Sequence, residues 1–266
     1  MLACGAVDAS DDEIRRALLA DILANPDDDA PRLVFADWLT ERGDPRGELI
    51  SLQCAAQHAT GGVLARHVNR ASALLERHGE AWVGEIRQIV RGVELKRGFV
   101  ASINATGSVF AKCGALFDQE PIEELRVIKP SARDLATIAK APHLAKLRSL
   151  VMLDPARIES DAHVQALGAL LRSPRLAKLR VLELRLAVAG AAGPSVRDTL
   201  GGLYLPALEQ LKLRVRAADE AGRPPVIVGA IAAAKLPKLR QLAVRKDSLG
   251  TLRSALPGIA ITALVD

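Results

Sequence analysis

The feature that most constrains the fold of this chain is a short leucine phrase that returns five times after residue 120. Each copy has the pattern L-x-x-L-x-φ, where φ is an aliphatic residue, and isoleucine takes the first position in the first copy. Its copies begin at Ile122, Leu147, Leu179, Leu208 and Leu239, so subtraction gives steps of 25, 32, 29 and 31 residues. A period of about 20–50 residues is typical of stacked repeats. A unit this short cannot cover its own apolar face, so neighbouring copies must pack on one another.

The phrase resembles a leucine-rich repeat, in which each unit contributes one short strand. Helix-compatible stretches lie between the copies, at residues 131–141, 159–172, 195–203, 226–236 and 248–256. Each is followed by a proline turn, at Pro142, Pro174, Pro206, Pro237 and Pro257. We therefore expect an α/β fold in which residues 91–266 form a leucine-rich-repeat-like solenoid, with a parallel strand ladder on the concave face and helices on the convex face. Residues 259–265 form a degenerate last unit, as expected at the end of a solenoid.

Residues 8–90 predict a helical module. Aliphatic residues recur there at helical spacing, and the signals for helix ends fit, with Pro31 suited to a first turn and Gly43 to a C-cap. Asp28 or Asp29 is expected to cap the second helix. Arg32 and Arg46 are expected to pair with the nearby carboxylates of Asp37, Asp44 or Glu48.

Two stretches of this module, Asp27–Leu39 and Glu41–Ile50, resemble the bacterial repeat-companion domain. Residues 74–82 and Arg97–Val100 are similar to the downstream part of that family, so the resemblance covers residues 10–104. Members carry this domain ahead of leucine-rich repeats, and the family implies no established activity. The resemblance therefore implies that the helical module caps the solenoid. Residues 93–104 alternate as a strand pair with a turn at Gly98, and this pair would open the array.

Charge is distributed unevenly along the chain. Residues 1–50 hold 12 Asp or Glu and 5 Lys or Arg, whereas the remainder holds 19 acids and 31 bases. This asymmetry predicts separate interaction surfaces, or docking of the acidic end on the basic end or on another copy.

The strand phrases also predict a candidate binding face. Residues between the last two aliphatic positions of each phrase should point to the concave surface. They are Arg126, Val151, Glu183, Lys212 and Ala243, and two residues further along lie Ile128, Leu153, Arg185, Arg214 and Arg245. The candidate partner-binding residues are therefore Arg126, Arg185, Lys212, Arg214 and Arg245. Adjacent like charges repel, so either acidic groups of a partner neutralise this ladder or Glu183 and the loops do.

The sequence offers no constellation typical of an enzyme. It lacks phosphate-binding glycine loops, a G-x-S-x-G elbow and an H-E-x-x-H pair. We expect no catalytic residue, metal or cofactor. The three cysteines are far apart and odd in number, which favours reduced thiols in the cytoplasm. No apolar run approaches the roughly 18 residues of a membrane span, so we expect no membrane partner.

These observations favour a non-enzymatic scaffold that holds an acidic or mixed-charge protein partner on its concave face. The alternative is binding to the phosphate backbone of nucleic acid, which the pI of 9.3 supports. Aromatic side chains for base stacking are scarce, however, and Tyr204 is the single tyrosine. An enzyme of unfamiliar type is a third hypothesis, because catalytic groups meet in space rather than in sequence.

Overall fold

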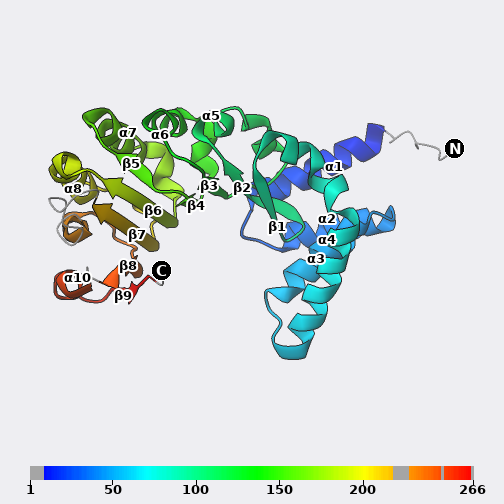
Figure 1. Ribbon diagram of the computed structural model, residues 1–266. Helices are drawn as coiled ribbons and strands as arrows, with labels where there is room; N and C mark the ends of the chain where they lie inside the picture. Colours follow the sequence, from blue (N-terminus) through cyan, green and yellow to red (C-terminus); the bar gives the residue numbers. More distant parts are fainter. Residues whose placement is uncertain (1–8, 218–227, 247–248, 265–266) are drawn as a thin grey trace. The chain divides into compact units, whose positions relative to one another are not determined.

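The computed structural model describes residues 9–217, 228–246 and 249–264 (Figure 1). These residues form an α/β fold with a mostly parallel, open, nine-stranded sheet in the order β1-β2-β3-β4-β6-β7-β8-β9, with β5 paired to β6. The chain forms two compact units. Of the described residues, the first unit takes those up to Ile89, then Val93–Ala101 and Ala115–Pro121; the second takes Val90–Gly92, Ser102–Gly114 and those from Ile122 onward. No helix within the described ranges is both long and apolar enough to cross a membrane.

The first unit contains four helices: α1 (Ala9–Ala24), α2 (Ala30–Glu41), α3 (Pro45–Ala56) and α4 (Gly61–Ile89). The N-cap of α2 is Asp29, whose side chain makes no capping hydrogen bond, and the carboxylate of the preceding Asp28 accepts from the Ala30 N–H at 2.9 Å. Asp44 caps α3 by accepting from the Arg46 N–H at 2.8 Å. The local signals for helix ends in the sequence therefore correspond to hydrogen bonds that satisfy otherwise orphaned amides.

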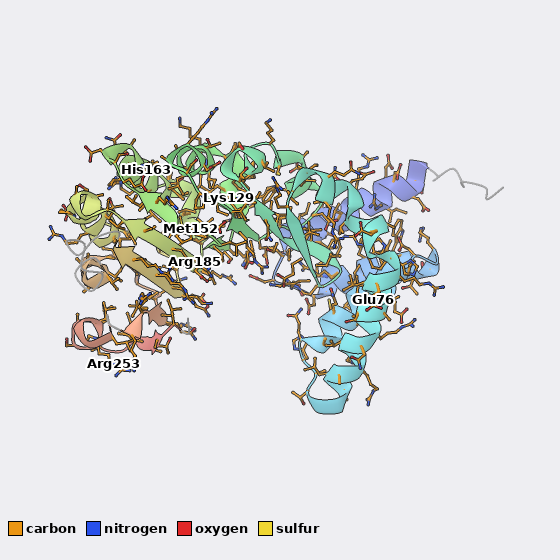
Figure 2. The ribbon with its side chains drawn as sticks, in the orientation of Figure 1. Glu76, Lys129, Met152, His163, Arg185 and Arg253 are labelled. Atoms are coloured by element: carbon orange, nitrogen blue, oxygen red, sulfur yellow. The ribbon has the colours of Figure 1, made fainter. Side chains whose placement is uncertain are left out.

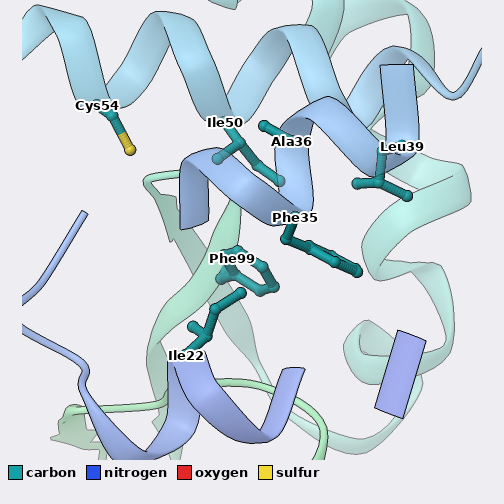
Figure 3. Packing of buried hydrophobic residues seen from close by; sticks show 7 residues of the cluster. All are labelled: Ile22, Phe35, Ala36, Leu39, Ile50, Cys54 and Phe99. Carbon is teal, nitrogen blue, oxygen red and sulfur yellow. The ribbon is translucent and has the colours of Figure 1, made fainter. Parts of the chain in front are cut away.

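The core of the first unit is a mixed aliphatic and aromatic cluster (Figure 3). Its buried members are Ile22, Phe35, Ala36, Leu39, Ile50, Cys54 and Phe99. The Phe35 ring stacks on the rings of Trp38 and Phe99, with centroid separations of 5.8 Å in both pairs. Full burial of a side chain such as Phe99 contributes about 1.5–3 kcal/mol. The cluster thus ties residue 99 to helices that are more than 40 residues earlier in the sequence.

Phe99 reaches this cluster from a β-hairpin. Strands β1 (Gly92–Lys96) and β2 (Phe99–Ala105) are joined by Arg97 and Gly98, whose φ angles are +52° and +78°. Two positive φ angles in a two-residue turn match the right-handed twist of the strands. Arg97 also donates to Asp29 Oδ1 at 3.0 Å and to the Pro26 carbonyl at 2.7 Å. The expected strand pair with a turn at Gly98 is confirmed.

The predicted partners of two arginines are wrong. Arg32 donates to the Asp28 carbonyl at 2.8 Å. The guanidinium of Arg46 donates to Glu120 Oε1 at 2.8 Å rather than to Asp37, Asp44 or Glu48. The second oxygen of Glu120 accepts from the Val100 N–H at 2.8 Å. The prediction considered carboxylates that are close to Arg46 in the sequence. The fold instead brings Glu120, 74 residues further along the chain, beside the Arg46 side chain.

The second unit is built around the strands that the leucine phrases form. They are β3 (Glu124–Val127), β4 (Ser149–Met152), β6 (Val181–Val188), β7 (Gln210–Ala217) and β8 (Gln241–Val244), followed by β9 (Ala260–Ala263). These strands pair in parallel with corresponding phrase positions in register. Leu125, Leu150, Leu182, Leu211, Leu242 and Ile261 make up one row. The prediction that the five phrases are strands is confirmed.

Helices and 3-10 turns connect these strands, and α6, α7 and α8 lie along one face of the sheet (Figure 1). The connecting elements are α5 (Gly107–Phe110), η1 (Gly114–Asp118), α6 (Ala132–Lys140), η2 (Pro142–Lys146), α7 (Asp161–Leu171), η3 (Pro174–Lys178), η4 (Gly190–Ala192), α8 (Gly193–Gly201), η5 (Ala230–Ala233) and α10 (Leu249–Ala255). A reciprocal capping box between Ser131 and Asp134 starts α6.

Three details of the second unit differ from the sequence prediction. The predicted helix at 226–236 contains the 3-10 turn η5, and residues 226–227 lie outside the described residues. An additional strand, β5 (Ala156–Ile158), pairs with the far end of β6. Strands β6 and β7 extend four residues beyond their phrases, because alternation of apolar and other residues continues through Leu186 and Val188.

Candidate functional site

The sheet of the second unit has two chemically different faces. On the helix-covered face, Leu125, Leu150, Leu182, Leu211 and Leu242 are at most 1% exposed. Alternate residues on the same strands are partly exposed, as the burial patterns of β3, β6 and β8 show. This alternation is the two-residue period of a strand with one face on the core. We call the second face, from β3 to β8, the open face.

The predicted site residues all belong to the open face or continue it. Arg126 on β3 is opposite Val151, and Lys212 on β7 lies between Glu183 and Ala243. Arg185 on β6, labelled in Figure 2, is directly opposite Arg214 on β7. Arg245 follows the last residue of β8 and thereby continues the row of Arg214. The structure therefore brings Arg185, Lys212 and Arg214 together and leaves Arg126 two strands away.

Glu183 is the acid at the centre of this basic group. Its side chain is buried, and Oε1 accepts from Arg185 Nε at 3.0 Å and from Arg185 Nη2 at 2.8 Å. Lys212 Nζ lies 4.0 Å from Glu183 Oε2. The third donor of Arg185, Nη1, contacts the Leu153 carbonyl at 2.9 Å. Arg185 is thus held by acceptors of its own chain. For this arginine, the sequence analysis had left open whether acids of a partner or Glu183 and the loops neutralise the charge, and the structure shows Glu183 and a loop carbonyl in that role.

The other end of the open face is less basic. Arg126 pairs with Glu124 on its own strand. Between Arg126 and Glu183 lies an apolar stretch of Ile128, Val151 and Leu153, each partly exposed. The open face therefore combines an aliphatic patch with a cluster of cations.

One cation of the open face was missed by the sequence prediction. Arg216 continues the alternation of Lys212 and Arg214 on β7 and is exposed. The prediction ended each strand with its phrase, whereas β7 runs on to Ala217. The alternating pattern Lys-x-Arg-x-Arg from 212 to 216 is the signal that could have identified this residue.

The buried cysteines and histidines serve packing within their own units. Burial raises the pKa of the Cys54 thiol to about 12 and also raises the pKa of Cys113. A raised thiol pKa disfavours the nucleophilic thiolate. His143 makes a 2.7 Å hydrogen bond with the Phe110 carbonyl, and its ring packs edge-on against the Phe110 ring. Within the described part of the chain, no group of three or more His, Cys, Asp and Glu residues is arranged to hold a metal ion.

Comparison of the chain with protein-family models and with curated proteins finds no match.

Proposed function

We propose that this chain is a non-enzymatic interaction scaffold that holds a protein partner of acidic or mixed charge on the open face of its sheet. The observation that carries the proposal is the charge balance of that face. Arg126, Arg185, Lys212, Arg214, Arg216 and Arg245 share it with two acids, Glu124 and Glu183. Both acids already pair with arginines, so an acidic partner would offset the remaining like-charge repulsion.

The aliphatic patch favours a protein over a nucleic acid on this face. Protein interfaces bury an apolar centre within a polar rim, and Ile128, Val151 and Leu153 lie beside the cations. The phosphate backbone offers no apolar group for that patch. A peptide surface with aliphatic and carboxylate side chains would cover both parts of the open face.

The finer architecture belongs to the same proposal. We infer that the second unit is a leucine-rich-repeat-like solenoid whose concave side is the open face, with helices on the convex side. The in-register row of phrase leucines supports this inference, because each copy covers the apolar face of the next. We further infer that the first unit is a repeat-companion domain and that the protein is cytoplasmic.

The test uses charge reversal at two exposed cations of the open face, Lys212→Glu with Arg216→Glu. Arg185 is left intact because its bonds to Glu183 and Leu153 are part of the fold. The matched control reverses Arg197 and Arg253, which are exposed on helices of the same unit. Immobilised wild type and both variants are used to capture a partner from the native cell after nuclease treatment. The captured protein is then purified, and its Kd is measured directly.

We expect the open-face variant to bind the purified partner at least about tenfold more weakly, with a loss that grows as salt is lowered. The control should bind like wild type, and all three proteins should melt within a few degrees of one another. Equal binding by the open-face variant would remove the open face as the docking surface. Loss of capture after nuclease treatment alone would favour the nucleic-acid alternative.

A further inference from the structure

A second basic surface lies in the same unit, at the edge where the strands begin rather than on the open face. Four segments that precede strands β4, β6, β7 and β8 form it, at residues 140–148, 172–180, 203–209 and 234–240. Together they contain ten Lys or Arg residues and one acid, Glu209. We call this surface the turn edge. Its exposed cations are Lys140, Lys146, Arg172, Arg175, Lys178, Arg180, Lys235, Lys238 and Arg240.

Backbone hydrogen bonds place the four segments side by side. The Arg180 N–H donates to the Arg148 carbonyl at 2.7 Å, and the Glu209 N–H donates to the Arg180 carbonyl at 2.8 Å. The Arg240 N–H donates in turn to the Glu209 carbonyl at 2.9 Å. The turns η2 and η3 also contact each other. Neighbouring segments therefore follow one another at the spacing of strands, about 4.7–4.9 Å.

The cations arise from a repeated tripeptide. Lys-Leu-Arg occurs three times along the turn edge, at 146–148, 178–180 and 238–240, and a fourth copy, 212–214, lies within β7. In the three turn-edge copies the central leucine is the buried first residue of a phrase, and its burial leaves the flanking lysine exposed. The same packing that builds the core thus displays lysines ahead of β4, β6 and β8, whereas the segment ahead of β7 contributes none.

Stabilisation of helix C-termini accounts for only some of the cations on the turn edge. Lys140 ends α6 and Arg172 follows α7, where a cation favours the negative end of the helix dipole. Arg175 and Lys178 lie in the five-residue 3-10 turn η3, which is too short for a comparable dipole, and Lys238 lies just before β8. Arg148 has an internal acid, Glu123, at 2.9 Å. Within the described part of the chain, Arg175, Lys178, Lys235 and Lys238 form no ion pair.

The turn edge also carries the only tyrosine of the chain. Tyr204 is 63% exposed, and it pairs with Lys235 through an isolated parallel β-bridge. In the described part of the second unit, no other large hydrophobic side chain is comparably exposed. A flat aromatic ring beside a row of cations is the arrangement with which proteins bind single strands, where bases stack and phosphates meet the cations.

We propose that the turn edge binds single-stranded nucleic acid, with its lysines and arginines contacting consecutive phosphates and Tyr204 stacking on a base. An excess of cations over acids, in which Glu209 and Glu123, the partner of Arg148, are the acids, fits a polyanion. An acidic protein would require apolar contacts, and the turn edge displays one exposed large apolar side chain, Tyr204, among its described residues. This proposal does not depend on the function of the open face, because the two surfaces use different residues.

The probe is a fluorescein-labelled 15-nucleotide DNA strand, followed by anisotropy between 50 and 300 mM salt. The test variant is Arg175→Glu with Lys178→Glu and Lys238→Glu. Its matched control reverses Arg15, Arg66 and Arg77, which are exposed on α1 and α4, so the net charge is identical. Removing three phosphate contacts should reduce the slope of log K against log salt by about 2. Affinity at low salt should fall at least about tenfold in the test variant and much less in the control.

Variants of Tyr204 test base stacking separately from electrostatic attraction, because they leave the charge of the protein unchanged. Tyr204→Ala should weaken binding of the strand about 5- to 150-fold, from the range of base stacking on aromatic rings. Tyr204→Phe should bind like wild type, and heparin should bind all three proteins equally. The open-face variant Lys212→Glu with Arg216→Glu should keep its affinity for the strand.

Three results would overturn the proposal. They are equal losses in the test and control variants, no effect of Tyr204→Ala on the DNA strand, or tighter binding of polyglutamate than of the strand by the open-face variant Lys212→Glu with Arg216→Glu. The last result would assign the turn edge to an acidic protein instead. If the triple reversal impairs folding, as judged by thermal melting, Lys178→Gln with Lys238→Gln replaces it, with Arg66→Gln and Arg77→Gln as the control. The slope should then fall by about 1.4.

Discussion

Arg46 and Glu120 are 74 residues apart in the sequence and form a 2.8 Å ion pair inside the first unit. Their side chains are only 12% and 8% exposed. Arg46 also donates to the Gly98 carbonyl at 2.9 Å, and its guanidinium lies 5.0 Å from the centroid of the Phe99 ring. One buried cation thus links helix α3, the β-hairpin and the segment around residue 120.

We predict that Arg46→Ala destabilises the first unit by about 3–5 kcal/mol, because it leaves the Glu120 carboxylate buried and uncompensated. Both tryptophans of the chain, Trp38 and Trp82, belong to this unit, so tryptophan fluorescence during urea unfolding reports on it directly. Arg70→Ala is the control, because Arg70 pairs with Glu48 at an exposed site where ion pairs contribute little.

A double-mutant cycle isolates the pair itself. Replacing both residues, Arg46→Met with Glu120→Met, should cost less than the sum of the two single changes, since neither charge is then left unpaired. Strict additivity would mean that the two side chains do not stabilise one another.

Gly98 tests the packing of the hairpin turn. A Cβ there would lie 2.1 Å from Ile50 Cγ1, in addition to the strain of a φ near +78°. Gly43 is the matched control, with φ at +72° and no neighbouring atom within 4 Å of a built Cβ. Gly43→Ala should cost about 1–2 kcal/mol from backbone strain alone, and Gly98→Ala should cost about 1–3 kcal/mol more from overpacking. Equal urea midpoints for the two variants would contradict the observed contact.

The leucine row of the second unit predicts a gradient of mutational cost. Leu182 is fully buried between Leu150 and Leu211, whereas Ile261 on the last strand is partly exposed. Leu182→Ala should lower the free energy of unfolding by about 2–5 kcal/mol, through lost burial and an unfilled cavity. Ile261→Ala should cost well under half of that. Urea unfolding followed by far-UV circular dichroism measures both, and similar costs would refute the gradient.

Cys54 predicts a loss of stability at alkaline pH. Burial, reinforced by the charge of Asp29, raises the pKa of its thiol from near 9 to about 12. A group with a raised folded-state pKa stabilises the fold fully below its unfolded pKa, and this contribution is lost as pH rises from about 9 toward 12. The urea midpoint of wild type should therefore fall more steeply between pH 9 and 11 than that of Cys54→Ala.

The same pKa shift predicts low reactivity of this thiol. At pH 8, iodoacetamide should leave Cys54 unmodified in the folded protein and modify it in urea, because the thiolate is the reactive form. Peptide mapping by mass spectrometry distinguishes Cys54 from the other cysteines. Rapid labelling of folded Cys54 at pH 8 would show that the side chain is not buried as described.

The periodic spacing of leucines in the sequence predicted most of the strands of the second unit. The five leucine phrases became five parallel strands because their two-residue alternation requires one apolar face. The same alternation placed Lys212 and Arg214 on the opposite face correctly. It missed Arg216 because the end of a strand depends on how far its neighbours continue to pair.

Local sequence signals were reliable where the physical interaction is local. Ser131 with Asp134 and Asp44 with Arg46 satisfy amides two or three residues away, and the turn at Gly98 follows from the φ angles that glycine permits. The partner of Arg46 was predicted wrongly, since the choice among several carboxylates depends on which one the folded chain buries beside it.

Residue order over a few positions is therefore enough to predict the strands, the apolar face of the sheet and the cationic composition of the second unit. That Glu183 holds Arg185, that Glu120 holds Arg46 and that Tyr204 lies beside Lys235 is seen in the folded chain alone. Those pairs join residues from different strands, turns and helices, or depend on which acceptors burial leaves within reach. Their free energy comes from burial and contact geometry that a linear pattern does not contain.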